Sequence, residues 1–214
     1  ATGVAHVVIA GGESEAAGGA GQRSQYLAER GIIVPPDEVH TNAYIAGIDY
    51  NPNWGQATVV TQVDIAGNNT LKYEGLNYQG TDFAGNPQDV SGMETFHLDF
   101  WTPDPTASGE IFRIKLVDAG ADGVVGTGGD DTEHELTFDA TTTPALGTGN
   151  WVALDVPLSD FTGLTGRTNL AQLIISGDPN TVYVDNIYFY AEGGGQLPAD
   201  QGHLLRDQRR RQPI

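Results

Sequence analysis

Cysteine is absent from all 214 residues of the sequence. This absence excludes disulfide bridges, thiolate metal sites, iron–sulfur clusters and cysteine nucleophiles together. Basic residues are also scarce, since 28 Asp and Glu outnumber 10 Lys and Arg and leave a net charge of −18. Such a charge repels phosphate backbones and anionic lipids, because nucleic-acid affinity comes largely from cations that neutralise phosphates. We therefore expect no nucleic-acid partner and no membrane partner.

Long apolar runs are missing as well. No segment approaches the roughly 20 apolar residues that a membrane-spanning helix needs. The opening ATGVAHVVIAGG lacks the basic region and the longer apolar run of a secretory signal peptide. If the protein is exported, we expect this chain to be its mature form or an excised piece.

The aromatic residues divide the chain into three zones. Residues 40–190 hold all three Trp, all seven Phe and seven of the eight Tyr. Residues 1–39 are rich in Gly and Ala, with one helix-like stretch at 24–30, and residues 191–214 end in the arginine-rich RDQRRRQPI. We expect one folded domain over 40–190, a flexible N-terminal extension or linker before it, and a disordered basic tail after it.

The central zone alternates apolar and polar residues as β-strands do. In residues 96–101, Phe96, Leu98 and Phe100 fall on one face of an extended chain. Turn-forming clusters such as AGNN, TPDPTASG and SGDPN separate this segment from other alternating ones. Those predicted strands cover 58–65, 70–73, 76–79, 111–117, 134–138, 151–156, 170–176 and 181–190. Short strands at this spacing predict an all-β fold, an antiparallel β-sandwich of the jelly-roll type.

Six segments occur in a fixed order within this zone: VSGMETFHLDFWTPD, FRIKLVDAGADG, EHELTF, WVALDVPLSDFTGL, NLAQLIISG and TVYVDNIYFY. As a set they resemble the non-catalytic β-sandwich modules of secreted bacterial polysaccharide hydrolases, especially laminarinase-type β-glucanases of marine bacteria. The ending VDNIYFY is similar to the last strand of many carbohydrate-binding modules with a galactose-binding-like jelly roll. The resemblance implies a secreted, non-catalytic module that binds a polysaccharide, most closely a β-glucan such as laminarin, beside an attached glycoside hydrolase domain.

A sugar-binding surface combines aromatic rings, which stack on pyranose C–H faces, with polar groups that bond to hydroxyls. In residues 96–101, the face opposite Phe96, Leu98 and Phe100 carries His97, Asp99 and Trp101. The polar face of residues 111–117 carries Arg113 and Lys115. If these two strands pair, one sheet surface carries all five of these polar and aromatic residues, with Trp101 as the stacking ring. The candidate carbohydrate-binding residues are His97, Asp99, Trp101, Arg113, Lys115 and Gln172, with the loop aromatics Tyr50 and Trp54.

Each of these residues also has a simpler interpretation. The polar face can be a solvent face with cross-strand ion pairs, such as Asp99 with Lys115, each worth less than about 1 kcal/mol. A Trp at a strand end can cover the core. A Trp in a loop, such as Trp54, can pack against protein because an unpacked ring lowers solubility.

An acidic, glycine-rich loop offers the oxygen ligands that Ca²⁺ prefers. Five carboxylates lie within the sixteen residues 118–133, among them Asp118, Asp122, Asp130 and Asp131. The spacing differs from that of an EF-hand, because Gly129 occupies the position of its bidentate Glu. The alternative is a solvated hairpin loop built on Asp-Gly turns.

The resemblance implies a second place for structural Ca²⁺. Modules with the galactose-binding-like fold often hold the ion with an Asp of the final strand, which corresponds here to Asp185. The partner ligand would come from near residue 42. An acidic residue is expected there, but this chain has Asn42. The alternative is that Asp185 accepts hydrogen bonds from neighbouring backbone.

Catalysis has one candidate pair. Glu133 and Glu135 flank His134 and would share a strand face about 6.6 Å apart along the chain, within the 5–10 Å that glycoside hydrolysis requires. The Glu-x-Asp-x-x-Glu strand motif of jelly-roll β-glucanases is missing, so a non-enzyme is favoured. Two alternatives stay open: a Ca²⁺-stabilised structural or adhesive module without a sugar site, and a jelly-roll hydrolase that uses this pair.

Overall fold

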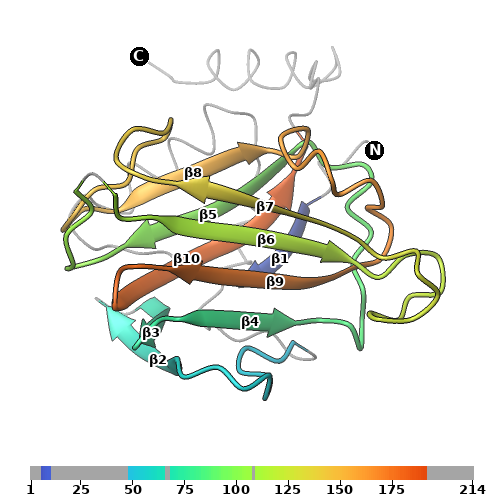
Figure 1. Ribbon diagram of the computed structural model, residues 1–214, viewed down its shortest axis with the longest axis horizontal. Helices are drawn as coiled ribbons and strands as arrows, with labels where there is room; N and C mark the ends of the chain where they lie inside the picture. Colours follow the sequence, from blue (N-terminus) through green and yellow to red (C-terminus); the bar gives the residue numbers. More distant parts are fainter. Residues whose placement is uncertain (1–5, 11–47, 66–67, 108, 192–214) are drawn as a thin grey trace, which may run out of the picture.

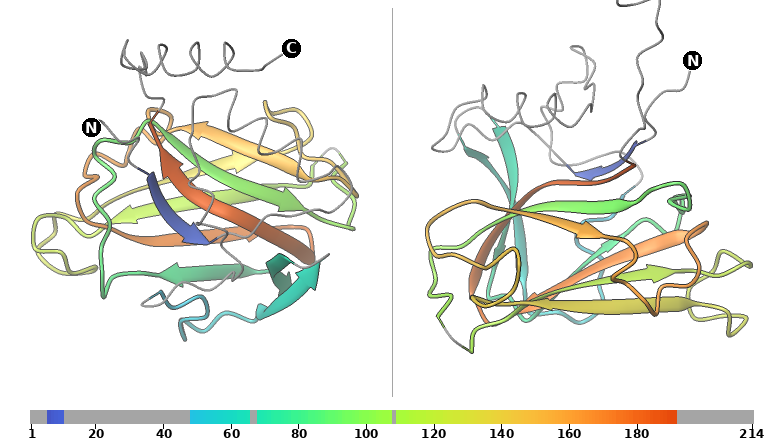
Figure 2. Two further views of the ribbon diagram at one scale, coloured as in Figure 1. Left: turned by 180° about the vertical axis from the view of Figure 1, so that it is seen from behind. Right: turned by 90° about the horizontal axis from the view of Figure 1, so that it is seen from above.

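The computed structural model describes residues 6–10, 48–65, 68–107 and 109–191. These residues form two antiparallel sheets that pack face to face (Figures 1 and 2). The six-stranded sheet has the order β2-β3-β10-β5-β8, with β1 also paired to β10. Its strands are β1 (His6–Ala10), β2 (Val59–Ile65), β3 (Asn68–Glu74), β5 (Thr95–Trp101), β8 (Val152–Pro157) and β10 (Thr181–Tyr190). The four-stranded sheet has the order β4-β9-β6-β7, made of β4 (Tyr78–Asp82), β6 (Phe112–Asp118), β7 (Thr132–Phe138) and β9 (Leu170–Gly177).

The strand order is that of a jelly roll. From β3 onward the chain crosses between the sheets at most connections, so that β3, β10, β5 and β8 lie opposite β4, β9, β6 and β7. The predicted all-β, antiparallel β-sandwich is confirmed. Among the described residues, no helix has the length and apolarity of a membrane span.

All nine strands predicted from the alternation are present, with ends that differ by a few residues. One strand was not predicted. β1 lies within residues 1–39 and pairs with the second half of β10, from His6 opposite Tyr190 to Ala10 opposite Ile187. That interval was expected to be an extension only. The helix-like residues 24–30 and the basic tail from residue 192 onward lie outside the described residues.

The core lies between the two sheets. Phe96, Leu98 and Phe100 of β5 are fully buried, as the alternation predicted. Phe112 of β6 meets them from the opposite sheet, with 4.6 Å between its ring centre and that of Phe100. Because each strand turns its apolar residues to this core, its remaining residues lie on two outer faces, one for each sheet.

A bulge in β10 adjusts this alternation. Asn186 has a φ of +50°, a conformation that Asn tolerates better than most residues. The register between β10 and β5 shifts between Asp185 and Tyr188. As a result Val184 and Ile187 are both fully buried although three positions separate them.

Candidate functional site

The outer face of the four-stranded sheet gathers polar and aromatic side chains from four strands. On β6 the outward residues are Arg113 and Lys115, which alternate with the buried Phe112, Ile114 and Leu116. The register places Arg113 between Ser176 of β9 and Thr137 of β7, and Lys115 between Ile174 and Glu135. We call this surface the four-strand face; it comprises Trp54, Tyr78, Gly80, Asp82, Arg113, Lys115, Glu133, Glu135, Thr137, Gln172, Ile174 and Ser176.

Trp54 is the main aromatic group of the four-strand face. Gln79 and Thr81 are buried on the inner side of β4, so Gly80 between them faces outward. A Cβ atom at Gly80 would collide with the six-membered ring of Trp54. The indole therefore lies directly on the strand and is partly buried there. A glycine within a strand signals such a close approach, and that signal in the sequence was missed.

Hydrogen bonds hold the main chain that carries this indole. The Tyr78 hydroxyl donates to the main-chain carbonyl of Trp54 at 2.6 Å, and the main-chain N–H of Trp54 donates to Gln56 Oε1 at 2.9 Å. Tyr78 is itself partly exposed on the four-strand face, two residues before Gly80 on β4. It was not among the predicted residues. The face thus carries an indole with a phenol beside it.

Ion pairs occupy the other half of the four-strand face. Lys115 Nζ lies 2.6 Å from Glu133 Oε1, and Arg113 Nε lies 3.5 Å from Glu135 Oε1. All four side chains are between 25% and 56% exposed. Exposed pairs of this type contribute less than about 1 kcal/mol, so a ligand can replace one partner at small cost. Both carboxylates of the possible catalytic pair are engaged in this way.

Only some of the predicted carbohydrate-binding residues lie on this face. Arg113, Lys115, Gln172 and Trp54 are on it. The single surface required strand 96–101 to pair with strand 111–117, and this condition is not met, because β5 pairs with β10 and β8 while β6 pairs with β7 and β9. The jelly-roll connection places these consecutive strands in opposite sheets. His97, Asp99 and Trp101 therefore project from the far side of the sandwich.

His97 and Asp99 are also not available to a ligand, since they are 2% and 8% exposed. His97 Nδ1 lies 2.7 Å from Asp155 Oδ1, and its Nε2 lies 3.2 Å from Asp99 Oδ1. The Tyr188 ring stacks on the imidazole at 4.5 Å, and the Tyr190 hydroxyl donates to Asp155. The expectation that these two polar residues form an open sugar-binding surface is wrong, because cross-strand partners enclose the imidazole between two carboxylates.

Tyr50 is a further correction. Its side chain is 4% exposed and belongs to the core, while its carbonyl accepts a hydrogen bond from Gln79 Nε2 at 2.9 Å. A ring in this position cannot stack on a sugar. Trp101, by contrast, is partly exposed on the outer face of the six-stranded sheet.

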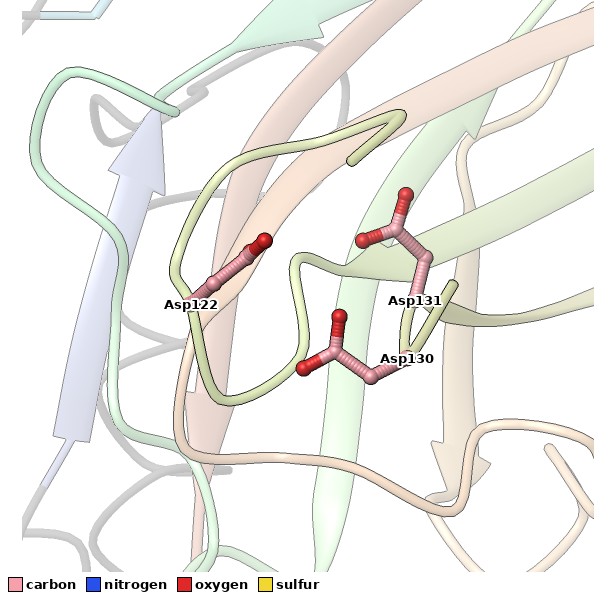
Figure 3. Close-up of side chains that lie close together, drawn as sticks. All are labelled: Asp122, Asp130 and Asp131. Carbon is pink, nitrogen blue, oxygen red and sulfur yellow. The ribbon is translucent and has the colours of Figure 1, made fainter. Parts of the chain in front are cut away.

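The loop between β6 and β7 brings three of the predicted metal ligands together. One ligand oxygen each of Asp122, Asp130 and Asp131 lies within 4.8 Å of the others, and the side chains turn toward a common space (Figure 3). A Cβ at Gly128 would lie 2.5 Å from Asp130 Oδ1 and 2.7 Å from Asp122 Oδ2. Gly128 also has a positive φ of 66°. Only glycine allows the backbone to approach the carboxylates so closely.

Backbone N–H groups already serve part of this cluster. Ala121 donates to Asp130 Oδ2 and Gly126 to Asp131 Oδ2, both at 2.6 Å. The Thr127 hydroxyl bonds to Asp122, and this bond, with that from the Val124 N–H, lowers the pKa of Asp122. Asp131 Oδ1 is buried and has no hydrogen-bond partner. The loop backbone thus wraps around the three carboxylates, and Asp131 Oδ1 is the buried oxygen among them that accepts no hydrogen bond.

The other two predicted ligands do not join this cluster. Asp118 is buried at the end of β6, where it accepts hydrogen bonds from the Gly120 N–H at 3.0 Å and the Asn169 N–H at 2.8 Å. Asp185 is buried in β10 and accepts from the Asn186 N–H at 2.8 Å. Both carboxylates accept hydrogen bonds from neighbouring backbone N–H groups. Asn42, near which the partner ligand of Asp185 was expected, lies outside the described residues, so a calcium ion at Asp185 stays a prediction.

Comparison with known proteins gives structural neighbours only, since no family model and no curated protein matches the chain. A family 30 carbohydrate-binding module of a cellulosomal cellulase of Clostridium thermocellum is similar, with 18% identity, a TM-score of 0.48, and coverage of 71% of this chain and 90% of that one. A carbohydrate-binding module specific for non-crystalline cellulose has 19% identity and a TM-score of 0.47, over 67% of this chain and 86% of that one.

A third similar structure is a family 11 carbohydrate-binding module from Clostridium thermocellum, in complex with a β-1,3-1,4-mixed-linked tetrasaccharide. It shares 16% identity and a TM-score of 0.46, over 74% of this chain and 94% of that one. All three are described as carbohydrate-binding modules.

The contact between Trp54 and Gly80 gives the first prediction. In Gly80→Ala the added methyl group occupies the space of the indole, so we expect the ring to move and its NMR indole N–H resonance to shift. Gly85→Ala is the matched control, because a Cβ there has no atom within 4 Å and φ is not positive. An unchanged Trp54 resonance in Gly80→Ala would contradict the packing described here.

The buried imidazole gives the second prediction. Burial lowers the pKa of His97, but hydrogen bonds and charge interactions with Asp155 and Asp99 outweigh burial and raise it above its usual value. The protonated form therefore stabilises the fold below about pH 6.5, and this contribution disappears as pH rises through the folded-state pKa. We expect the difference in unfolding free energy between wild type and His97→Gln to shrink over that interval. Urea titrations at a series of pH values measure it, and parallel curves would refute the coupling.

Proposed function

We propose that the chain is a non-catalytic carbohydrate-binding module and that the four-strand face binds an uncharged polysaccharide. The observation that carries this proposal is the Trp54 indole, packed against Gly80 beside a sheet surface of hydrogen-bonding side chains. A preset ring stacks on a sugar without first losing conformational freedom. It contributes on the order of 1 kcal/mol, as other aromatic contacts do.

The polar half of the face supplies the orientation. Gln172 of β9 lies opposite Asp82 of β4 and Val117 of β6, and together with Arg113 and Lys115 it offers hydrogen-bond donors and an acceptor. Sugar hydroxyls act as both donor and acceptor, so they match this mixture. The net charge of −18 favours neutral glycans over anionic ones, because like charges repel during approach.

We further propose that the glycan is a β-glucan such as laminarin, and that the module is secreted and attached to a glycoside hydrolase domain. In that arrangement its role is targeting. A weak site raises the local concentration of the attached enzyme on its substrate, so that even modest affinity increases the rate of attack.

A hydrolytic role for the four-strand face has less support. Glu133 and Glu135 are exposed and paired with Lys115 and Arg113. The general acid of a glycosidase works instead in apolar surroundings that keep its carboxyl group protonated.

We also propose a structural Ca²⁺ in the loop between β6 and β7, held by Asp122, Asp130 and Asp131. Carboxylate oxygens are the ligands Ca²⁺ prefers. Three of them converge on one space, Gly128 leaves that space open, and the buried Asp131 Oδ1 lacks a partner. A divalent ion would offset the repulsion among the three carboxylates and hold the loop rigid.

The sugar-binding proposal is tested by calorimetry with laminarin, mixed-linkage β-glucan, xylan and alginate. We expect an uncharged glucan to bind, alginate not to bind, and Trp54→Ala to weaken the interaction about tenfold, the equivalent of roughly 1.4 kcal/mol. Val124→Ala is the control, since Val124 is 52% exposed and lies away from this face. Failure of every neutral glycan to bind, or full affinity in both Trp54→Ala and Gln172→Ala, would refute it.

The calcium proposal is tested by thermal unfolding in Ca²⁺ and in a chelator. At a free Ca²⁺ concentration of about 100 Kd, binding adds about 2.7 kcal/mol, which raises the Tm by about 5–10 °C for a chain of this length. We expect Asp130→Asn and Asp131→Asn to abolish the rise and Asp160→Asn, an exposed residue outside the loop, to retain it. A Tm that does not respond to Ca²⁺ would remove the proposal.

A further inference from the structure

A row of aromatic rings crosses the outer face of the six-stranded sheet. The register pairs Trp101 of β5 with Tyr183 of β10, Tyr183 with Lys72 of β3, and Lys72 with Thr61 of β2. On the other side of β5, Phe100 pairs with Val152 of β8. Trp151 directly precedes Val152, so continuing the same register by one residue would bring it opposite Trp101. We call Trp151, Trp101 and Tyr183 the aromatic row.

The row faces away from the core. Its strand neighbours Phe100, Val182 and Val184 are fully buried, and Val152 packs against the core from β8. By alternation, the three aromatic side chains lie on the outer side of the sheet. All three are partly exposed. The row is thus on the opposite side of the sandwich from the four-strand face.

Contacts within the sheet hold the rings in place. Trp101 and Tyr183 meet edge to face, with ring centres 5.1 Å apart and an angle of 81°. Lys72 Nζ lies 5.9 Å from the centre of the Tyr183 ring and 2.8 Å from Glu74 Oε1. A cation, a carboxylate and two fixed rings therefore stand side by side, and little side-chain freedom is left to lose on binding.

The geometry of the row suits an extended sugar polymer. Neighbouring strands lie about 4.7–4.9 Å apart, so a chain of sugars lying across the strands passes one ring at each step. Because Trp101 and Tyr183 are nearly perpendicular, one of these two rings offers its face and the other its edge. At the far end, Lys72, Glu74 and Thr61 offer donors and acceptors for hydroxyl groups. This is the combination of aromatic surface and a few polar groups that ligand sites use.

Charge selects among the possible occupants. A second copy of the chain, or an anionic polymer, would bring more negative charge to a molecule that already carries −18. Repulsion disfavours both. A neutral polysaccharide has no such cost and can stack on the rings.

We propose that the aromatic row is a second carbohydrate-binding surface, so that each chain binds two strands of neutral polysaccharide, one on each outer face of the sandwich. The inference rests on the proposed function of the four-strand face and extends it. Because the two surfaces point in opposite directions, the two bound strands cannot belong to one short stretch of glycan. The protein then joins separate polysaccharide chains.

The test counts bound sugars. Calorimetry with a short soluble mixed-linkage β-glucan oligosaccharide should give two bound oligosaccharides per wild-type chain. In Trp54→Ala and in Trp101→Ala, one of the two sites should weaken about tenfold while the other keeps its affinity, and in the double variant both should weaken. With the long polymer, light scattering should rise for the wild type and stay low for either single variant. Trp101→Phe should retain scattering, since a ring remains. Trp151→Ala provides a second variant in case Trp101→Ala lowers stability, which circular dichroism would reveal.

Several outcomes overturn the inference. One oligosaccharide per wild-type chain, unchanged in Trp101→Ala and Trp151→Ala, would leave only the four-strand face. Sedimentation of the wild type as a dimer that Trp101→Ala dissociates would show that a second copy covers the row. Binding that Trp101→Ala abolishes and Trp54→Ala does not affect would instead refute the four-strand face and support the row. Absence of all binding would refute both surfaces.

Discussion

The contact between the inner faces of β5 and β6 joins the two sheets of the sandwich. Phe96, Leu98 and Phe100 on one strand, and Phe112, Ile114 and Leu116 on the other, are fully buried, and the rings of Phe100 and Phe112 lie 4.6 Å apart. Burial of side chains this large contributes about 1.5–3 kcal/mol each. Because these residues occupy the inner positions, every intervening residue of both strands lies on an outer face. The two surfaces proposed to bind sugar are therefore a direct consequence of how the core is packed.

Small residues decide what those faces and the adjoining loop can do. Gly80 lets an indole lie on the backbone of β4, and Gly128 lets two carboxylates approach the loop backbone. In both places a single Cβ atom would displace a functional group. Side-chain chemistry alone does not account for either arrangement, since the glycine beside the chemistry sets its position.

The sequence predicted the strands and their faces well, because alternation is a local property that the core enforces on each strand. Phe96, Leu98 and Phe100 point inward as expected. Strand pairing could not be predicted, because it depends on where each connection crosses the sandwich. The surface that Trp101 and Arg113 would have shared if their strands paired therefore does not form. The burial of His97 could not be predicted from the sequence either. Its partners Asp155 and Tyr188 are brought to it from strands far away in the sequence.

The short strand β1 covers part of an edge of the six-stranded sheet. β10 pairs with β5 along most of its length, but on its other side β3 covers only residues 181–184. β1 continues the pairing over residues 187–190. Without β1, those residues would present unpaired N–H and C=O groups to any extended chain, which is the usual starting point of intermolecular strand addition. β1 thus covers a stretch of backbone that would otherwise be open to strand addition, which gives it a structural consequence separate from ligand binding.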